Sequence, residues 1–137
     1  MLVSAIVLSA CKTEKSNMKE NHSIIQESLY LGQTPPGLFP ELFAPNVVSI
    51  NGRYESTISF SPDLKELYFD AHQEGEPFQI YFSKLDNGAW TPIKRANFTQ
   101  GNRRQELHPF VRHDNERLYF TAMDSTFKDE KIWYVTR

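Results

Sequence analysis

Residues 55–71 of the chain read ESTISFSPDLKELYFDA, and residues 106–122 read ELHPFVRHDNERLYFTA. The two stretches align without a gap at an offset of 51 residues, as from Glu55 to Glu106. Their identities include an acidic turn residue and the tripeptide Leu-Tyr-Phe, in the same order. Self-similarity at a fixed spacing of this size indicates a repeated supersecondary unit. The chain is therefore predicted to contain two copies of one structural element.

Each copy has the pattern of short strands separated by turns. Apolar and polar residues alternate around 58–60 and over 67–71, which is the period of a half-buried strand. Between these runs, residues 61–65 place Pro and Asp for a tight reversal, and Asp-Asn-Gly at 86–88 is a hairpin signal. The later expected strands are 78–84 and 90–95 in the first copy, and 108–112, 117–123 and 131–136 in the second.

The predicted fold class is all-β, with antiparallel four-stranded blades of a β-propeller. Large side chains fall on both faces of the strands, which suits a blade that packs against a neighbour on each side. About two blades are expected, at 55–105 and 106–137, and the second is incomplete because its fourth strand is missing. A lead-in at 31–54 precedes them, and its β-branched run at 46–50 is a candidate outer or ring-closing strand.

The turn and the strand after it carry a family resemblance. The segments Ser-Pro-Asp at 61–63 and Leu-Tyr-Phe at 67–69, with their counterparts in the second copy, resemble the WD40-like β-propeller repeat of the PD40 type. That repeat occurs in the TolB propeller and in many secreted bacterial proteins. The family turn usually ends in glycine, where this chain has Leu64 and Asn115. Leucine tolerates a left-handed backbone poorly, so the first turn is expected to differ in geometry.

The repeat selects candidate structural residues. Asp63 and Asp114 occupy the same turn position and are expected to accept backbone hydrogen bonds. Glu55 and Glu106 also recur, and a repeated position indicates architecture more often than a site. The expected repeat core, buried equivalently in the two copies, consists of Leu67, Phe69, Leu118 and Phe120.

The N-terminus has the pattern of a targeting segment. Residues 1–10 contain a short apolar run that is typical of a signal-peptide core, and residues 8–11 resemble the lipobox of bacterial lipoproteins. This resemblance implies lipidation at Cys11, a flexible tether over 11–30, and a periplasmic or outer-membrane lipoprotein of the bacterial cell envelope. The alternative is a buried N-terminal strand that contains an ordinary cysteine.

Composition excludes several classes of function. The formal net charge is −2 with no long basic stretch, so no nucleic-acid partner is expected. A single cysteine excludes a cysteine-rich zinc site, and His108 and His113 are predicted to point to opposite faces of a strand. No nucleophile motif or glycine-rich phosphate loop is present. We therefore expect no catalytic residues, no metal and no cofactor.

The predicted function is non-catalytic binding of a protein or an envelope ligand by a lipid-anchored propeller module. Isolated repeats cannot bury their own faces, so the chain is either part of a longer protein, which we favour, or associates with itself or a partner. The alternative function is the N-terminal propeller part of a larger secreted hydrolase, either prolyl oligopeptidase-like or active on polysaccharides.

Overall fold

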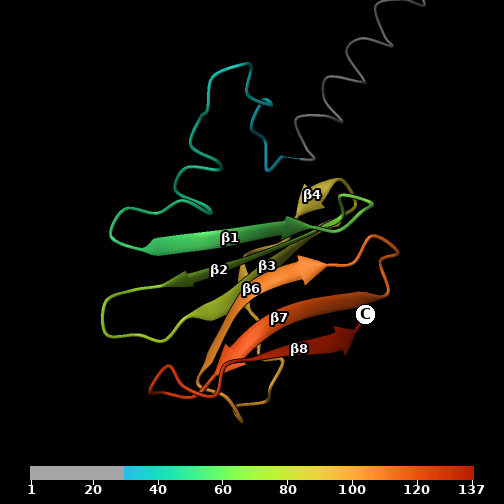
Figure 1. The fold of residues 1–137 in the computed structure, drawn as a ribbon. Coiled ribbons are helices and arrows are strands. Elements are labelled where there is room, and N and C mark those ends of the chain that lie inside the picture. Colours follow the sequence, from blue (N-terminus) through green and yellow to red (C-terminus); the bar gives the residue numbers. More distant parts are fainter. Residues whose placement is uncertain (1–29) are drawn as a thin grey trace, which may run out of the picture.

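The computed structural model describes residues 30–137, so the predictions for residues 1–29, Cys11 among them, lie outside the described residues. The described residues form eight strands and no helix (Figure 1), which confirms the all-β prediction. These strands are β1 (Tyr54–Phe60), β2 (Glu66–His72), β3 (Gln79–Asp86), β4 (Ala89–Trp90), β5 (Lys94–Arg95), β6 (Gln105–Val111), β7 (Arg117–Met123) and β8 (Lys131–Thr136).

The strands form two antiparallel sheets, which follow the two copies of the repeat. Sheet I consists of β1–β5: β1, β2 and β3 are successive neighbours, and both β4 and β5 pair with β3. Sheet II consists of β6, β7 and β8 in that order. The fourth strand expected at 90–95 is divided into β4 and β5, with Pro92 between them. Proline has no N–H to donate to a strand ladder, which explains the interruption.

The first strand of each sheet carries the same irregularity. The pairing of β1 with β2 shifts register between Glu55 and Ile58, and the pairing of β6 with β7 shifts between Leu107 and Phe110. These intervals overlap when the two copies are aligned at their offset of 51 residues. The repeat therefore extends to backbone bulges, which sequence alternation alone does not predict.

The turns after β1 and β6 also match, and here the sequence expectation was wrong. Leu64 has a φ of 57° and Asn115 a φ of 65°, so both residues are left-handed. The turn around Leu64 is held by the Ser61 hydroxyl oxygen, which accepts the amide N–H of Lys65 at 3.1 Å and of Glu66 at 2.8 Å. These bonds hold the left-handed geometry although leucine is intrinsically unfavourable there.

Leu64→Gly should therefore raise the free energy of unfolding. Glycine adopts a positive φ without the Cβ clash that costs an ordinary residue about 1–2 kcal/mol, so we expect a gain of about 0.5–1 kcal/mol after the loss of the leucine side chain. Urea unfolding of the two proteins measures the difference. Asn115→Gly is the matched control and should change stability less, because asparagine tolerates this conformation. A lower stability for Leu64→Gly would contradict the prediction.

The two sheets pack face to face, and β6 lies across sheet I (Figure 1). The amide N–H of Glu106 donates to the Phe78 carbonyl at 3.1 Å, and that of Val111 donates to the Ser59 hydroxyl at 3.0 Å. Aliphatic and aromatic side chains from both sheets fill the space between them. The buried members of this inter-sheet core are Tyr68, Ile80, Ala96, Val111, Leu118, Phe120 and Ala122.

The opposite face of sheet I is covered by the lead-in. Ala44 and Val48 are buried there against Leu67, Phe69 and Ala71. The outer strand proposed for residues 46–50 does not form: the segment makes a turn in which the amides of 47–49 all donate to the Ala44 carbonyl. Its β-branched residues are therefore used to bury Val48 rather than to extend a sheet.

Candidate binding surface

Three loops meet at one end of the two sheets. The β2–β3 loop (73–78) and the β7–β8 loop (124–130) both lie at the left of Figure 1, and the connection from β5 to β6 (96–104) joins them. Two adjacent pockets of about 360 and 340 Å³ open among these loops and share His72, Glu76 and Pro77. This loop end is the candidate binding surface.

His72 is fixed at the centre of this surface by aromatic contacts. Its ring is stacked on Tyr54, with a centroid distance of 4.9 Å and an interplanar angle of 17°, and lies 4.1 Å from the Phe78 ring centroid. Its Nδ1 lies 3.0 Å from the Gln73 carbonyl. A carbonyl can only accept, so Nδ1 carries the proton in this arrangement. The imidazole is thus held in one orientation between the two pockets.

Two buried glutamines hold the loops together. Gln79 Nε2 donates to the Phe78 and Arg104 carbonyls, both at 2.7 Å. Gln105 Oε1 accepts from the Phe78 amide at 3.5 Å, and Gln105 Nε2 donates to the Asp124 carbonyl at 3.4 Å. Gln79 therefore links the β2–β3 loop to the β5–β6 connection, and Gln105 links it to the β7–β8 loop.

The β7–β8 loop is shaped by its own carboxylate. Asp124 Oδ1 accepts the amide N–H of Lys128 at 3.0 Å and of Thr126 at 2.8 Å, and the Thr126 hydroxyl at 2.7 Å. The hydrogen bond from the Lys128 amide is the main reason that the pKa of Asp124 lies below its usual value. This closed turn carries Ser125 and Phe127, which line the second pocket.

Positively charged side chains border both pockets. Arg95 lines the first and Arg104 the second, and both are exposed. Arg53 also lines the first pocket, but Glu55 holds its guanidinium at 2.6 Å. Glu76 is the acidic residue common to the two pockets. The surface therefore offers two unburied guanidinium groups beside one carboxylate and one imidazole.

A buried carboxylate joins the two sheets behind this surface. Asp70, on β2, is fully buried. Its Oδ1 accepts the Ser56 amide at 3.2 Å, the Ser56 hydroxyl at 2.6 Å and the Thr57 amide at 2.9 Å. Its Oδ2 accepts the His108 amide at 2.7 Å. Asp70 thus satisfies the backbone donors that the two bulges release from their ladders.

The recurring glutamates hold the segment that precedes each sheet. Glu106 is buried, and its Oε1 accepts the Thr99 amide and hydroxyl, both at 2.7 Å, while Oε2 accepts the Phe98 amide at 3.2 Å. Glu55 accepts the Ile50 amide at 3.4 Å from the lead-in. The aligned carboxylates therefore have corresponding structural contacts in the two copies.

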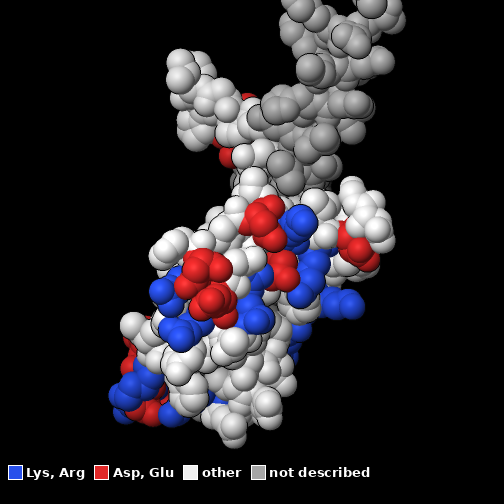
Figure 2. Space-filling model, turned by 90° about the vertical axis from the view of Figure 1, so that its right-hand side faces the viewer, with Lys and Arg blue, Asp and Glu red and all other residues white. Residues whose placement is uncertain are grey.

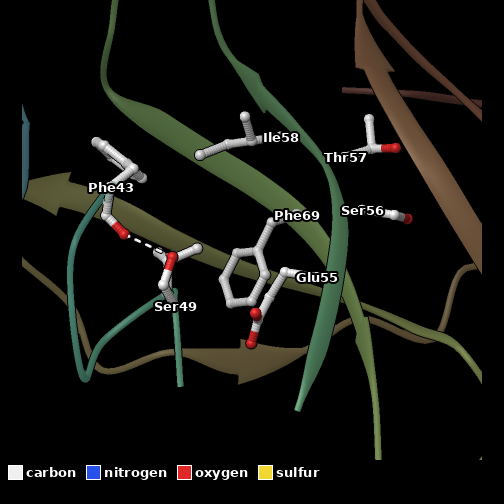
Figure 3. Close-up of a pocket in the computed structure, with 8 residues that line it drawn as sticks. Phe43, Ser49, Glu55, Ser56, Thr57, Ile58 and Phe69 are labelled. Atoms are coloured by element: carbon white, nitrogen blue, oxygen red, sulfur yellow. Dashed lines mark hydrogen bonds between the residues drawn. The ribbon is translucent and has the colours of Figure 1, made fainter. Parts of the chain in front are cut away.

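A third pocket lies on the lead-in side of sheet I (Figure 3). It has a volume of about 150 Å³ and is lined by Phe43, Val48 and Phe69 together with part of β1. The Ser49 hydroxyl beside it donates to the Phe43 carbonyl at 2.8 Å. This pocket is a gap in the cover that the lead-in provides, and its walls are mainly apolar.

Charges of both signs are interspersed on the end that carries the β1–β2 turn and the C-terminus (Figure 2). Within residues 30–137, no three His, Cys, Asp or Glu side chains lie close enough to share a metal ion. The same described part of the chain contains no helix that is long and apolar enough to cross a membrane.

No family model matches the chain. A comparison with curated proteins also finds no significant match.

The residues selected from the repeat occupy equivalent places. Asp63 Oδ1 accepts the Lys65 amide at 3.2 Å, and Asp114 Oδ1 accepts the Glu116 amide at 3.1 Å. Leu67, Phe69, Leu118 and Phe120 are all buried, the first pair under the lead-in and the second between the sheets. None of these six residues lines the loop-end pockets.

Sequence reasoning missed the residues that build the candidate surface. For Asp70, which lies behind the surface, the usable signal was an acidic residue within an alternating strand, on the face opposite Leu67 and Phe69. Gln79 and Gln105 gave none, because a glutamine is an ordinary surface residue unless its burial is known.

Asp63, in the turn between β1 and β2, gives the stability of the protein a predictable dependence on acid. The hydrogen bond from the Ser61 hydroxyl is the largest cause of its lowered pKa. A carboxylate with a lowered folded-state pKa stabilises the protein above its unfolded pKa, and this contribution is lost as the pH falls through the folded value. The stability difference between wild type and Asp63→Asn should therefore be constant near neutrality and shrink below about pH 4.

Urea titrations at several pH values measure this difference. Asp86→Asn, on an exposed residue at the end of β3, is the matched control for general effects of acid. A difference that grows as the pH falls would contradict the assignment of Asp63.

Proposed function

We propose that the chain is a non-catalytic β-propeller module that binds a protein or a cell-envelope ligand through its loop end. Two sheets that share register shifts, turn geometry and face-to-face packing support the propeller assignment. The observation that carries the binding proposal is the pair of adjacent pockets that share His72. Pockets formed by loops on a rigid scaffold are a common way for a fold to present a binding site.

The groups around these pockets favour a ligand with a carboxylate or a similar anionic group. Exposed guanidinium groups of Arg95 and Arg104 are suited to bidentate pairing with a carboxylate. The exposed ring of Tyr54, which is stacked on His72, offers a flat face for an apolar or sugar part of the same ligand. An acidic peptide or an acidic fragment of the envelope fits both requirements.

Isothermal titration with an acidic peptide and with a soluble muramyl peptide tests the proposal. Arg95→Ala combined with Arg104→Ala should weaken binding at least about tenfold, since each charge-assisted bond contributes about 1.5–3 kcal/mol. Lys65→Ala combined with Lys84→Ala removes the same charge from the opposite end and should leave affinity unchanged. Equal effects of the two double variants, or binding of neither probe, would overturn the proposed site.

We also propose that Cys11 carries the lipid that anchors the module in the bacterial cell envelope. The sequence around Cys11 supports this proposal. Intact mass after expression with its signal segment in a bacterial host should exceed the polypeptide mass by acyl chains, and Cys11→Ser should abolish the increase. An unmodified, membrane-free protein would overturn the anchor without affecting the binding proposal.

A further inference from the structure

The lead-in contains a loop whose tip is apolar and exposed. Leu38 is 100% exposed, Phe39 82% and Leu42 65%. The chain bends at residues 38–39, and this part of the lead-in rises away from β1 (Figure 1). Single apolar side chains on a surface are ordinary, whereas several large ones in one short segment mark an interaction surface.

One side chain closes the base of this loop. Gln33 Nε2 donates to the Leu42 carbonyl at 3.0 Å, and Gln33 Oε1 accepts the Ala44 amide at 2.7 Å. Ala44 is itself buried against sheet I. Three prolines within residues 34–41 restrict the backbone between these contacts. The apolar tip is therefore presented to solvent on a constrained neck.

The loop carries almost no charge. Between residues 31 and 52 the only charged side chain is that of Glu41, and the next one along the chain is Arg53, which is paired with Glu55. An anionic surface would find no cation at the tip with which to pair. A partner of this loop must therefore offer an apolar environment to Leu38 and Phe39.

The position of the loop in the sequence favours a membrane as that partner. Cys11, the proposed point of attachment, lies 19 residues before Tyr30. An extended chain of this length spans at most about 65 Å, so the lead-in stays near the bilayer. Attachment at one point raises the effective concentration of the membrane at the loop, and a weak second contact then becomes populated.

The surroundings of the tip also favour a membrane over a groove on another protein. Protein interfaces surround an apolar centre with a polar rim that makes hydrogen bonds. Here residues 35–37 and 40 beside the tip are Pro, Pro, Gly and Pro, which have no side-chain donors or acceptors. Leucine and phenylalanine are among the side chains with which peripheral proteins enter the boundary between headgroups and acyl chains.

We propose that Leu38, Phe39 and Leu42 insert into the outer part of the bilayer to which Cys11 is attached. The proposal rests on the proposed attachment at Cys11, because even one myristoyl chain alone holds a protein only marginally. A single attachment point does not fix the orientation of the sheets relative to the membrane. Insertion of the loop provides a second point, and so limits the directions in which the loop-end pockets can face.

Insertion can be measured with the attachment supplied chemically. Cys11 is the only cysteine of the chain, so the full chain can be coupled through it to a maleimide lipid in phosphatidylcholine vesicles. Phe39→Trp then reports insertion through quenching by phosphatidylcholine with brominated acyl chains, and the wild type gives the baseline of the two native tryptophans. Phe127→Trp is the matched control, because it changes the same residue type at a 65% exposed position of the β7–β8 loop. We expect quenching above the baseline for Phe39→Trp and none for Phe127→Trp.

A charge at the tip tests the role of the apolar side chains. In the Phe39→Trp protein, Leu38→Asp should lower the ratio of inserted to free loops by at least about tenfold, since that factor corresponds to burial of one leucine side chain. Asn46→Asp adds the same charge at an exposed position of the lead-in outside the loop, and should leave the ratio unchanged. Neither change should alter the urea midpoint, because both side chains are exposed.

Equal quenching of Phe39→Trp and Phe127→Trp, or a ratio that Leu38→Asp leaves unchanged, would overturn the proposal. Because the attachment is chemical, the result does not depend on whether a cell acylates Cys11, which the intact mass tests separately. The loop-end pockets are not involved either, so each of the three proposals can fail without the others.

Discussion

Replacing Asp70 with alanine should lower the free energy of unfolding by about 3–5 kcal/mol. The carboxylate accepts three backbone amides and one hydroxyl from the two bulged strands. Its removal leaves these partly buried donors without their acceptor, at a cost of about 1–3 kcal/mol for each group that water does not reach. The free energy of unfolding of a small domain is only about 5–15 kcal/mol in total. The variant should therefore be close to unfolding at physiological temperature.

Urea unfolding followed by tryptophan fluorescence measures the loss. Asp86→Ala removes an exposed carboxylate from the end of β3 and should change stability by less than about 0.5 kcal/mol. Asp70→Asn keeps one acceptor oxygen but turns an NH₂ group towards a donor, so it should fall between wild type and Asp70→Ala. If Asp70→Ala and Asp86→Ala unfolded at the same urea concentration, the bridging role of Asp70 would be wrong.

Replacing Phe120 with alanine should also lower the free energy of unfolding, again by about 3–5 kcal/mol. Phe120 is buried between the sheets, where its ring centroid lies 5.2 Å from that of Phe98, and truncation of a buried phenylalanine to alanine leaves a cavity. Since this core contains side chains from both sheets, both should unfold in one transition. Single-tryptophan proteins that retain either Trp90 or Trp133 should therefore report the same lowered midpoint.

Phe127→Ala is the matched control, because it removes the same side chain from an exposed loop position. Its expected change is within about 0.5 kcal/mol. Two separate transitions, with only Trp133 responding to Phe120→Ala, would show instead that the sheets are independent.

The repeat was sufficient to predict the all-β class and most of the strands. Alternation placed Leu67 and Phe69 on one strand face, and the matched tripeptide placed Leu118 and Phe120 on another; the structure has strands at both places. The predictions that failed concern positions whose conformation depends on tertiary contacts. Leu64 adopts a conformation that its own propensity opposes because Ser61 holds the turn, and residues 46–50 turn back because burial of Val48 outweighs their β propensity.

The candidate surface was harder to predict, for a physical reason. The buried carboxylate behind it, Asp70, aligns with Thr121 in the second copy, so the comparison of repeats discards it. Asp70 serves a contact between the sheets, and only the strand that receives the other sheet needs that acceptor. Residues that serve the contact between the two sheets differ between the two copies. An alignment of the copies detects only the residues that they share.

The matched bulges of β1 and β6 have a consequence for solubility. Both are first strands with a free edge, and a regular free edge is a template for unwanted strand addition and aggregation. A bulge breaks the spacing of donors and acceptors, and Asp70 occupies the donors that the bulge releases. The edge of β8 has no such interruption along its pairing with β7. Of the edges of β1, β6 and β8, the fold therefore interrupts the first two and leaves the third regular.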